Sequence, residues 1–311
     1  MNRAVELLRR GEIVALPTET VYGLAADALN EAAVLKIFEA KSRPRFDPLI
    51  VHLPEADWIG RVAVVHNSVR SLFDELRNHF WPGPLTFIFP RQPIISDVVT
   101  AGLQTVAVRL SPHPVFAEIA SAFGRPLAAP SANRFGRISP TTAVHAVEEL
   151  DGLIPLVVDA GPTAHGLEST IVALRNDRIE VLRRGPVTKE QLAEFAEVVI
   201  VGDTLNPEAP GQLPSHYAPS TPLILVDDAT TFDLEKDKRA GLLSWKTKRD
   251  ARFAEIRLLS ERKNLAEAAT NLFRSLRELD SLNLDLIVAE KLPDEGLGAA
   301  INDRLRRAAG K

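Results

Sequence analysis

Side chains that could bind an anion recur at the ends of apolar segments in this chain. Pro17–Leu24 (PTETVYGL) carries three hydroxyls and a carboxylate directly after the apolar run Ile13–Leu16. Lys41–Pro44 (KSRP) adds two cations, and Pro48–His52 (PLIVH) is an apolar run that ends in histidine. Polar groups gathered at strand ends commonly build the small-molecule pockets of α/β sheets. The ordered set therefore predicts such a pocket.

Two arginines stand where they could face an anion. Arg43 and Lys41 follow the expected helix Ala32–Ala40, and a proline and an apolar strand hold them beside the sheet, as suits a polyphosphate. Compensation of the helix dipole is the simpler explanation of these cations. Arg109 ends the apolar run Thr105–Arg109, and its guanidinium suits a carboxylate. An ion pair with a nearby glutamate explains Arg109 equally well at this point.

A further polar group lies in Ala129–Ala143 (APSANRFGRISPTTA). Ser131 and Asn133 follow a strand there, and Thr141 or Thr142 is expected to cap the next helix. Hydroxyls and free amides at a helix N-terminus can bind phosphate. Helix capping alone accounts for the two threonines but not for the serine and asparagine.

Two later segments repeat the pattern, and motifs of other chemistries are missing. Gly166–Thr170 (GLEST) and Leu182–Gly185 (LRRG) place polar groups at strand ends. The sequence contains no HExxH, GxxxxGK[ST] or GxSxG motif and no cluster with metal-ligand spacing. A covalent protein nucleophile is therefore not indicated, and the polar groups are suited to holding an anionic substrate.

Composition sets the broad class. The 311 residues are 45% hydrophobic and 25% charged, as in globular proteins, and suffice for two cores. A net charge of −4 argues against an RNA-binding surface over the whole molecule, although 37 Lys and Arg leave room for a basic pocket. No apolar stretch is long enough for a membrane span, and no signal peptide is apparent. The absence of cysteine excludes disulfides and thiolate sites and fits a cytoplasmic protein.

Alternating apolar runs and amphipathic patterns predict an α/β fold with a mixed, twisted sheet up to about Val201. The expected strands are Ile13–Leu16, Leu49–Leu53, Leu85–Phe89, Val106–Leu110, Leu127–Ala129, Leu156–Val158, Thr170–Leu174 and Ile179–Leu182. The expected helices are the N-terminal segment, Ala32–Ala40, Val69–Phe80, Val115–Phe123, Ala143–Leu150 and Lys189–Ala196.

A second α/β unit follows a segment rich in proline, Asp203–Pro222, which is typical of an extended linker. Its expected strands are Leu223–Val226, Leu242–Ser244, Ile256–Leu259 and Leu284–Ala289, and its expected helices are Leu265–Leu279 and Ala299–Ala308. This pattern predicts a small Rossmann-like domain, and without a glycine-rich fingerprint it predicts no dinucleotide site. We expect a first domain at 1–202, a linker at 203–221 and a second domain at 222–311.

The motifs, taken in order, resemble those of the YrdC-like threonylcarbamoyl-AMP synthases. The matching segments are PTETVYGL, KSRP…PLIVH, PGPLTFI, TVAVR, APSAN…ISPT, GLESTI and LRRG, and PGQLPSHYAP in the linker resembles the longer, two-domain members. The resemblance covers essentially the whole chain, densest through Gly185 and weakest in the C-terminal part. It implies a YrdC-like domain with a basic concave pocket, joined to the Rossmann-like domain.

The resemblance implies a nucleotidyltransferase that converts L-threonine, bicarbonate or CO2, and ATP to L-threonylcarbamoyl-AMP and pyrophosphate, with Mg2+. The product would feed the machinery that transfers threonylcarbamoyl to tRNA; direct tRNA binding is not predicted either way. The chemistry suits the residues, because attack of a carbamate on the α-phosphate needs alignment and charge neutralisation more than a protein nucleophile.

Carried over by motif, the resemblance gives the pocket two sides. The L-threonine side comprises Thr20, His52, Arg109, the backbone at Ala129, and Ser169. The ATP side comprises Arg43, Asp47, Thr105, Ser131, Ser139, Arg183 and Tyr217, with Lys41 and Asn133 as further candidates near the phosphates. Arg109 would bind the carboxylate of threonine. The linker is expected to act as a lid, with His216 and Tyr217 touching the nucleotide.

Two positions depart from the family pattern. Asp47 stands where asparagine is common, so its carboxylate would act through Mg2+ or a sugar hydroxyl, or would not touch the nucleotide. The linker has Gln212, Leu213 and Ser215 where the family often has basic residues.

Two other classes of protein are alternatives to the enzyme. A non-catalytic RNA-binding module of the same fold would use the basic concavity for an RNA backbone. Carbamoyl transferases of a related lineage carry cysteine-rich zinc segments, which a chain without cysteine cannot supply. The acidic net charge and the complete threonine-side set favour the enzyme.

Overall fold

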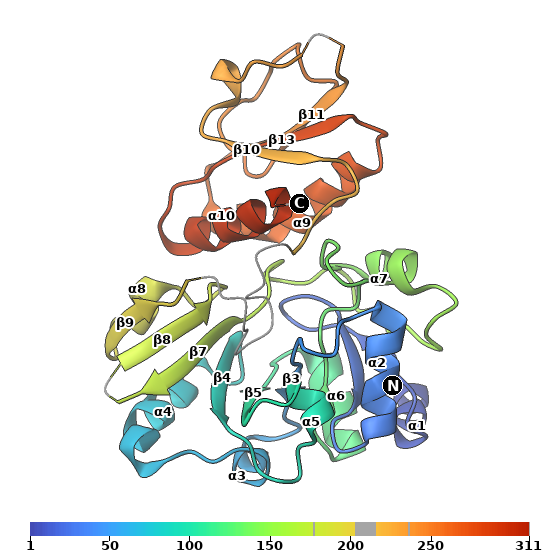
Figure 1. Ribbon diagram of the computed structural model, residues 1–311, viewed down its shortest axis with the longest axis vertical. Helices are drawn as coiled ribbons and strands as arrows, with labels where there is room; N and C mark the ends of the chain where they lie inside the picture. Colours follow the sequence, from blue (N-terminus) through green and yellow to red (C-terminus); the bar gives the residue numbers. More distant parts are fainter. Residues whose placement is uncertain (177, 203–215, 236, 311) are drawn as a thin grey trace.

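The computed structural model describes residues 1–176, 178–202, 216–235 and 237–310, which form two α/β domains (Figure 1). The larger domain contains a nine-stranded sheet and the smaller one a four-stranded sheet. In Figure 1 the smaller domain stands above the larger, with its helices α9 and α10 turned toward it. The two-domain α/β architecture predicted from the sequence is confirmed.

The larger sheet is mixed. Its strands, in spatial order, are β1 (Val14–Leu16), β2 (Gly23–Asp27), β6 (Leu127–Ala128), β3 (Ile50–His52), β5 (Thr105–Arg109), β4 (Leu85–Pro90), β7 (Thr170–Arg175), β8 (Arg178–Arg183) and β9 (Glu197–Ile200). The pairs β3–β5, β4–β7 and β8–β9 are parallel and the other neighbours antiparallel. The parallel register of β3 and β5 sets His52 beside Arg109, so both residues lie at the same end of these two strands.

Helices and short turns cover this sheet. They are α1 (Asn2–Arg9), α2 (Glu31–Lys41), η1 (Ala56–Trp58), α3 (Ile59–Val62), α4 (Asn67–Phe80), α5 (Asp97–Thr100), α6 (Pro114–Phe123), α7 (Ala143–Leu150) and α8 (Lys189–Leu192). Helix α2 begins at Asn30, whose side chain accepts a hydrogen bond from the Ala33 amide. It ends where Ser42 adopts the left-handed conformation, with φ at 50°. This turn places Lys41 and Arg43 on either side of the helix end.

The smaller domain has a wholly parallel sheet. Its strands, in spatial order, are β10 (Leu223–Val226), β13 (Leu286–Glu290), β11 (Ala240–Ser244) and β12 (Glu255–Leu258), accompanied by η2 (Ala229–Thr231), α9 (Leu265–Asp280) and α10 (Gly296–Ala309). Helix α9 is capped by Asn264, which accepts from two backbone amides. Across the described ranges, every helix is too short or too polar to cross a bilayer.

Most predicted elements appear within three residues of their expected ends. Strands β2 and β9 were missed, since the β2 sequence GLAAD lacks the β-branched residues that mark a strand. The predicted strand Leu156–Val158 was wrong: only Val157 forms a bridge, with Ala15. The predicted helix Lys189–Ala196 ends at Leu192, because the chain then turns into β9. Most of the predicted linker, residues 203–215, lies outside the described residues.

An apolar cluster joins the two domains. Val21, Ile138 and Leu167 of the larger domain are buried together with Leu272 and Phe273 of α9. Removal of this much apolar surface from water favours one packed arrangement of the domains over separated ones.

A glycine permits the closest approach between the domains. A Cβ added to Gly166 would lie 2.6 Å from the Ala269 carbonyl oxygen and from the Thr270 Cα, and its φ of +68° also disfavours a side chain. The backbone of the loop before β7 therefore rests directly on α9.

Replacement of Gly166 by Ala tests this contact. The left-handed backbone alone costs about 1–2 kcal/mol for alanine, and displacement of α9 adds to it. We expect the free energy of unfolding, measured by urea denaturation, to fall by about 2 kcal/mol or more. Gly60→Ala is the control, because nothing lies within 4 Å of a Cβ there. Equal unfolding midpoints for the two variants would contradict the packing described.

Candidate active site

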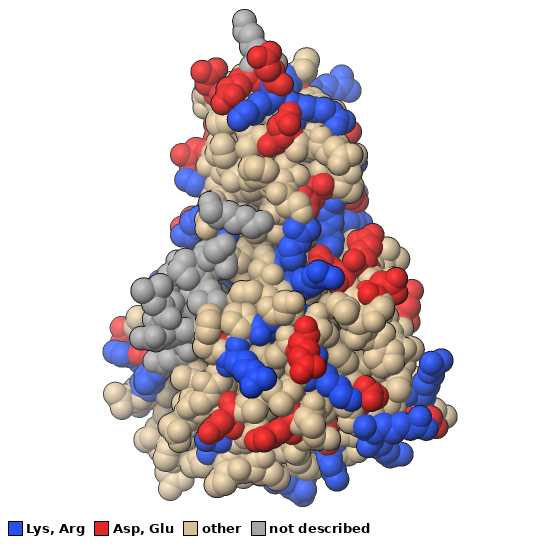
Figure 2. Space-filling view, turned by 45° about the vertical axis from the view of Figure 1, so that its right-hand side comes forward, with Lys and Arg blue, Asp and Glu red and all other residues tan. Residues whose placement is uncertain are grey.

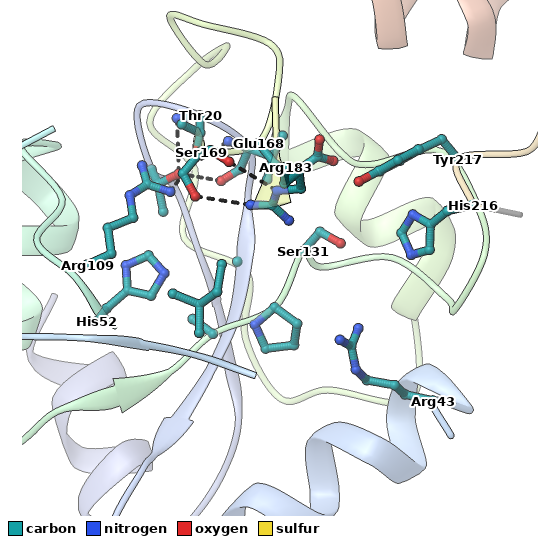
Figure 3. Close-up of a pocket in the computed structure, with 16 residues that line it drawn as sticks. Thr20, Arg43, His52, Arg109, Ser131, Glu168, Ser169, Arg183, His216 and Tyr217 are labelled. Carbon is teal, nitrogen blue, oxygen red and sulfur yellow. Dashed lines mark hydrogen bonds between the residues drawn. The ribbon is translucent and has the colours of Figure 1, made fainter. Parts of the chain in front are cut away.

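A pocket lies where strand ends of the larger sheet meet the segment before the smaller domain (Figure 3). Arginine, histidine and hydroxyl side chains reach into it from separate segments of the chain. Among the residues that the structure describes, three arginines and one carboxylate line it, which gives this lining an excess of positive charge. Such a cavity is suited to an anionic small molecule.

Nine of the predicted site residues line this pocket. From the threonine side they are Thr20, His52, Arg109, Ala129 and Ser169, and from the ATP side Arg43, Ser131, Arg183 and Tyr217. The convergence of these strand ends is what the sequence led us to expect. His216, expected near the nucleotide, lines the pocket as well.

Five predicted site residues do not line the pocket: Lys41, Asp47, Thr105, Asn133 and Ser139. Thr105 begins β5 and Arg109 ends it, so the two are about 13 Å apart at the usual rise of a strand. Thr105 therefore lies at the opposite end of β5 from Arg109, and the structure does not bring it to the pocket.

The other four residues lie one layer behind the lining. The buried Lys41 ammonium donates to the backbone oxygens of Ser131 and Asn133, which fixes the loop that carries Ser131. Asp47 forms an ion pair with Arg43 at 2.9 Å, and Arg43 also donates to the Pro48 carbonyl at 2.8 Å. The Asp47 carboxylate thus faces Arg43 rather than the pocket, and burial raises its pKa.

Arg109 is held by a residue that the sequence analysis did not single out. Its guanidinium donates to the Thr20 hydroxyl at 3.0 Å and pairs with Glu19. The second oxygen of Glu19 accepts from the Ser111 hydroxyl at 2.6 Å. The glutamate pairing weighed for Arg109 is therefore present, and Arg109 lines the pocket all the same. Its Nε has no hydrogen-bond acceptor among the described residues.

Ser169 and Arg183, both in the pocket lining, are linked to each other. Arg183 donates from Nε to the Ser169 carbonyl oxygen and from Nη2 to its hydroxyl, both at 3.0 Å. The Ser169 hydroxyl also bonds that of Thr86 at 2.7 Å. Burial lowers the pKa of Arg183 to about 10, so its guanidinium remains charged at neutral pH.

Glu168 supplies the carboxylate of the lining and was also missed. It accepts from the Ser139 hydroxyl and pairs at 2.8 Å with Arg304 of α10. Burial acts to raise the pKa of Glu168, but the charges of Arg304 and Arg183 hold it below its usual value. Glu168 is therefore ionised at neutral pH. The GLEST motif marked its position, whereas nothing local marked Arg304.

His52 lines the pocket as a neutral imidazole. Burial and the neighbouring Arg109 lower its pKa well below the usual value. Its ring packs on Phe116 with centroids 4.9 Å apart, and its Nδ1 has no partner among the described residues. A neutral imidazole can thus offer a lone pair or a hydrogen to a ligand.

Two residues after the undescribed segment close the pocket. Tyr217 is buried, and its ring stacks on Phe273 of α9 with centroids 5.7 Å apart. The His216 ring lies 4.2 Å from that of Tyr217. The next amide, of Ala218, donates to the Gly136 carbonyl at 2.8 Å, which fixes this segment against the larger domain.

Together the fold and the pocket define a two-domain α/β protein with an arginine-lined cavity in its larger domain, closed by the segment that carries His216 and Tyr217. Residues 6–185 match the family described as "Telomere recombination", and residues 187–310 match "Threonylcarbamoyl-AMP synthase, C-terminal domain". The chain belongs to the Sua5/YrdC family of threonylcarbamoyl-AMP synthases, in agreement with the resemblance seen in the sequence.

Individual relatives match along nearly their whole length. The chain is 40% identical over 322 residues to the threonylcarbamoyl-AMP synthase of Bacillus subtilis, covering 99% of this chain and 92% of that protein. It is 36% identical to the Pyrococcus abyssi synthase, with 99% and 93% coverage. The crystal structure of P. abyssi Sua5 complexed with L-threonine superposes with a TM-score of 0.88 at 35% identity, covering 99% and 93% of the two chains.

The neutral state of His52 predicts a pH dependence of stability. An unfolded histidine takes up a proton near pH 6.5, whereas buried His52 does not. Acid therefore favours the unfolded chain: a fall from pH 7.5 to 5.5 should remove about 1.4 kcal/mol of stability through this group. Urea denaturation at both pH values should show that His52→Gln loses about 1.4 kcal/mol less than the wild type. Equal losses would show that His52 takes up its proton alike in the folded and unfolded chains, and would contradict a neutral, buried His52.

Proposed function

We propose that this chain forms L-threonylcarbamoyl-AMP and pyrophosphate from L-threonine, bicarbonate or CO2, and ATP. Membership of the synthase family supports the reaction. The observation that carries the proposal for this chain is the meeting of its threonine-side residues with Arg43, Ser131 and Arg183 in one pocket.

On the threonine side, Arg109 binds the substrate carboxylate. The ion pair with Glu19 and the bond to Thr20 fix the guanidinium before substrate arrives, which lowers the entropy lost on binding. Neutral His52 of β3 is paired with Arg109 of the neighbouring strand β5. Because His52 is uncharged, Arg109 supplies the positive charge that binds the substrate carboxylate.

On the nucleotide side, Arg43 and Arg183 neutralise the phosphates, and Ser131 lies between them in the view of Figure 3. The threonine amine adds to CO2 with loss of a proton, and a carbamate oxygen attacks the α-phosphorus. The bond from that phosphorus to the bridging oxygen breaks, and pyrophosphate leaves. Positive charge fixed in a buried pocket stabilises the negative charge that builds up in this step.

Magnesium enters this proposal as the counter-ion of ATP. Among the described residues, no group of three or more His, Asp or Glu could hold a metal. Mg2+ in nucleotide sites is often held mainly by phosphates and water. Asp47 is paired with Arg43, so the proposal gives it no direct contact with the ion.

The wider assignments follow from the reaction. The product passes in the cytoplasm to the tRNA threonylcarbamoyl-transfer machinery. We retain domains at 1–202 and 222–311 and a linker at 203–221 that acts as a lid. His216 and Tyr217 support the lid, since both line the pocket.

The RNA-binding alternative receives little support. On the face seen in Figure 2, basic and acidic side chains are interspersed over both domains. The arginines of the pocket are buried, so they cannot reach a helical phosphate backbone. An RNA-binding module would lose affinity steeply with salt, and pyrophosphate release that requires threonine and bicarbonate would exclude it.

Pyrophosphate release with each substrate omitted in turn tests the function. We expect release only when threonine, bicarbonate and ATP are all present. Arg109→Ala should lower kcat/KM for threonine by about 10- to 100-fold, because charge-assisted hydrogen bonds are lost. Arg61→Ala, on the exposed surface, is the control. Release from ATP alone, or an Arg109 variant with normal kinetics, would contradict the assignment.

Replacement of Tyr217 tests the lid. Tyr217→Ala removes a buried ring from the pocket wall, and we expect it to raise KM for ATP several-fold, roughly the effect of 1 kcal/mol. Tyr217→Phe keeps the ring and should stay close to the wild type. Unchanged ATP kinetics in the alanine variant would count against a role of this segment over the nucleotide.

A further inference from the structure

We propose that Arg304, a residue of the smaller domain, is a positioning residue for the nucleotide side of the pocket. This inference rests on the proposed function. Arg304 comes from α10, yet its side chain is only 1% exposed and lies among residues of the larger domain. It does not line the pocket itself.

The Arg304 guanidinium ties three separate segments together. Its Nε donates to Glu168 at 2.8 Å, and its Nη2 donates to the Arg184 carbonyl at 2.8 Å. Its plane lies over the Tyr217 ring, 5.0 Å from the centroid. A buried guanidinium is strongly unfavourable unless it is paired. Its Nη1 also pairs with Asp303 of the same helix at 2.9 Å. The contacts with Glu168, Arg184 and Tyr217 therefore favour the docked position of α10 seen here.

Each of the three contacts leads to the nucleotide side. The second carboxylate oxygen of Glu168 accepts from the Ser139 hydroxyl. Arg184 directly follows Arg183, whose side chain lines the pocket. Tyr217 forms part of the same wall. Arg304 thus acts on the nucleotide through residues that touch the pocket.

The pairing also controls which arginine the Glu168 carboxylate neutralises. Glu168 lies close enough to Arg183 for their charges to interact. With Arg304 in place, one carboxylate oxygen is engaged by Arg304 and the other by Ser139. Arg183 is the other arginine whose charge acts on Glu168. Without Arg304, the carboxylate would be balanced by Arg183 instead, which removes positive charge needed by the phosphates. Loss of Arg304 therefore weakens the binding of ATP more than the binding of threonine.

A second ion pair between the domains provides a matched control. Arg277 of α9 pairs with Glu149 of α7 at 3.0 Å, and neither residue lines the pocket. Glu149→Gln removes the charge of this pair but leaves Arg277 bonded to the Ile138 carbonyl. It weakens the contact between the domains without touching the Glu168 network.

The test uses the full chain and two measurements. Calorimetric titration with ATP gives Kd without threonine, and pyrophosphate release gives KM for both substrates. For Arg304→Gln we expect Kd and KM for ATP to rise about tenfold, with KM for threonine within about twofold of the wild type; tenfold corresponds to about 1.4 kcal/mol. Arg304→Lys should give an intermediate value, because an ammonium can pair with Glu168 but lacks the planar fork. Glu149→Gln should stay within about twofold for both substrates.

The outcomes separate this inference from the proposed function. The positioning role is overturned if Arg304→Gln or Arg304→Lys binds ATP with the affinity of the wild type. It is also overturned if Arg304→Gln and Glu149→Gln both weaken threonine and ATP to the same extent. A wild-type protein that binds no ATP, or releases no pyrophosphate with all substrates present, overturns the proposed function instead and the inference with it.

Discussion

The pairing of buried arginines with buried carboxylates is the constraint on which this pocket depends. A guanidinium removed from water without a partner is unfavourable by several kcal/mol. Here Arg43 has Asp47 and Arg109 has Glu19, and Arg304 has Glu168. Because each carboxylate fixes its arginine, the positive groups of the pocket are set in place before any ligand binds. The charge therefore selects an anionic ligand, and the fixed geometry selects its shape.

The two domains contribute unequal parts of this arrangement. The larger sheet supplies the register that sets His52 beside Arg109 and the strand ends that carry the hydroxyls. No described residue of the smaller domain lines the pocket, but Phe273 covers Tyr217 and Arg304 holds Glu168. The apolar cluster around Val21 and Leu167 is buried between the domains, so the smaller domain docks when the chain folds. The C-terminal domain thus belongs to the architecture of the site.

The sequence predicted what is local and missed what depends on distant pairing. Periodicity found most strands, because an apolar run marks a buried strand whatever it pairs with, but it missed β2, whose small residues carry no such signal. Motifs at strand ends indicated the lining residues. Glu19 and Arg109 lie 90 residues apart, and Glu168 and Arg304 lie 136 apart. Such partners cannot be read from spacing, and Arg304 stands in an otherwise ordinary helix. Thr105 begins β5 and Arg109 ends it, so the strand itself separates Thr105 from the lining residues.

The most direct test of this arrangement is a structure of the chain with L-threonine and a non-hydrolysable ATP analogue. We expect the threonine carboxylate on Arg109 and the phosphates against Arg43 and Arg183, with the pairs described above intact. Either ligand bound outside this cavity, or a pocket whose arginines leave their carboxylates on binding, would contradict the claim that paired arginines build the site in advance.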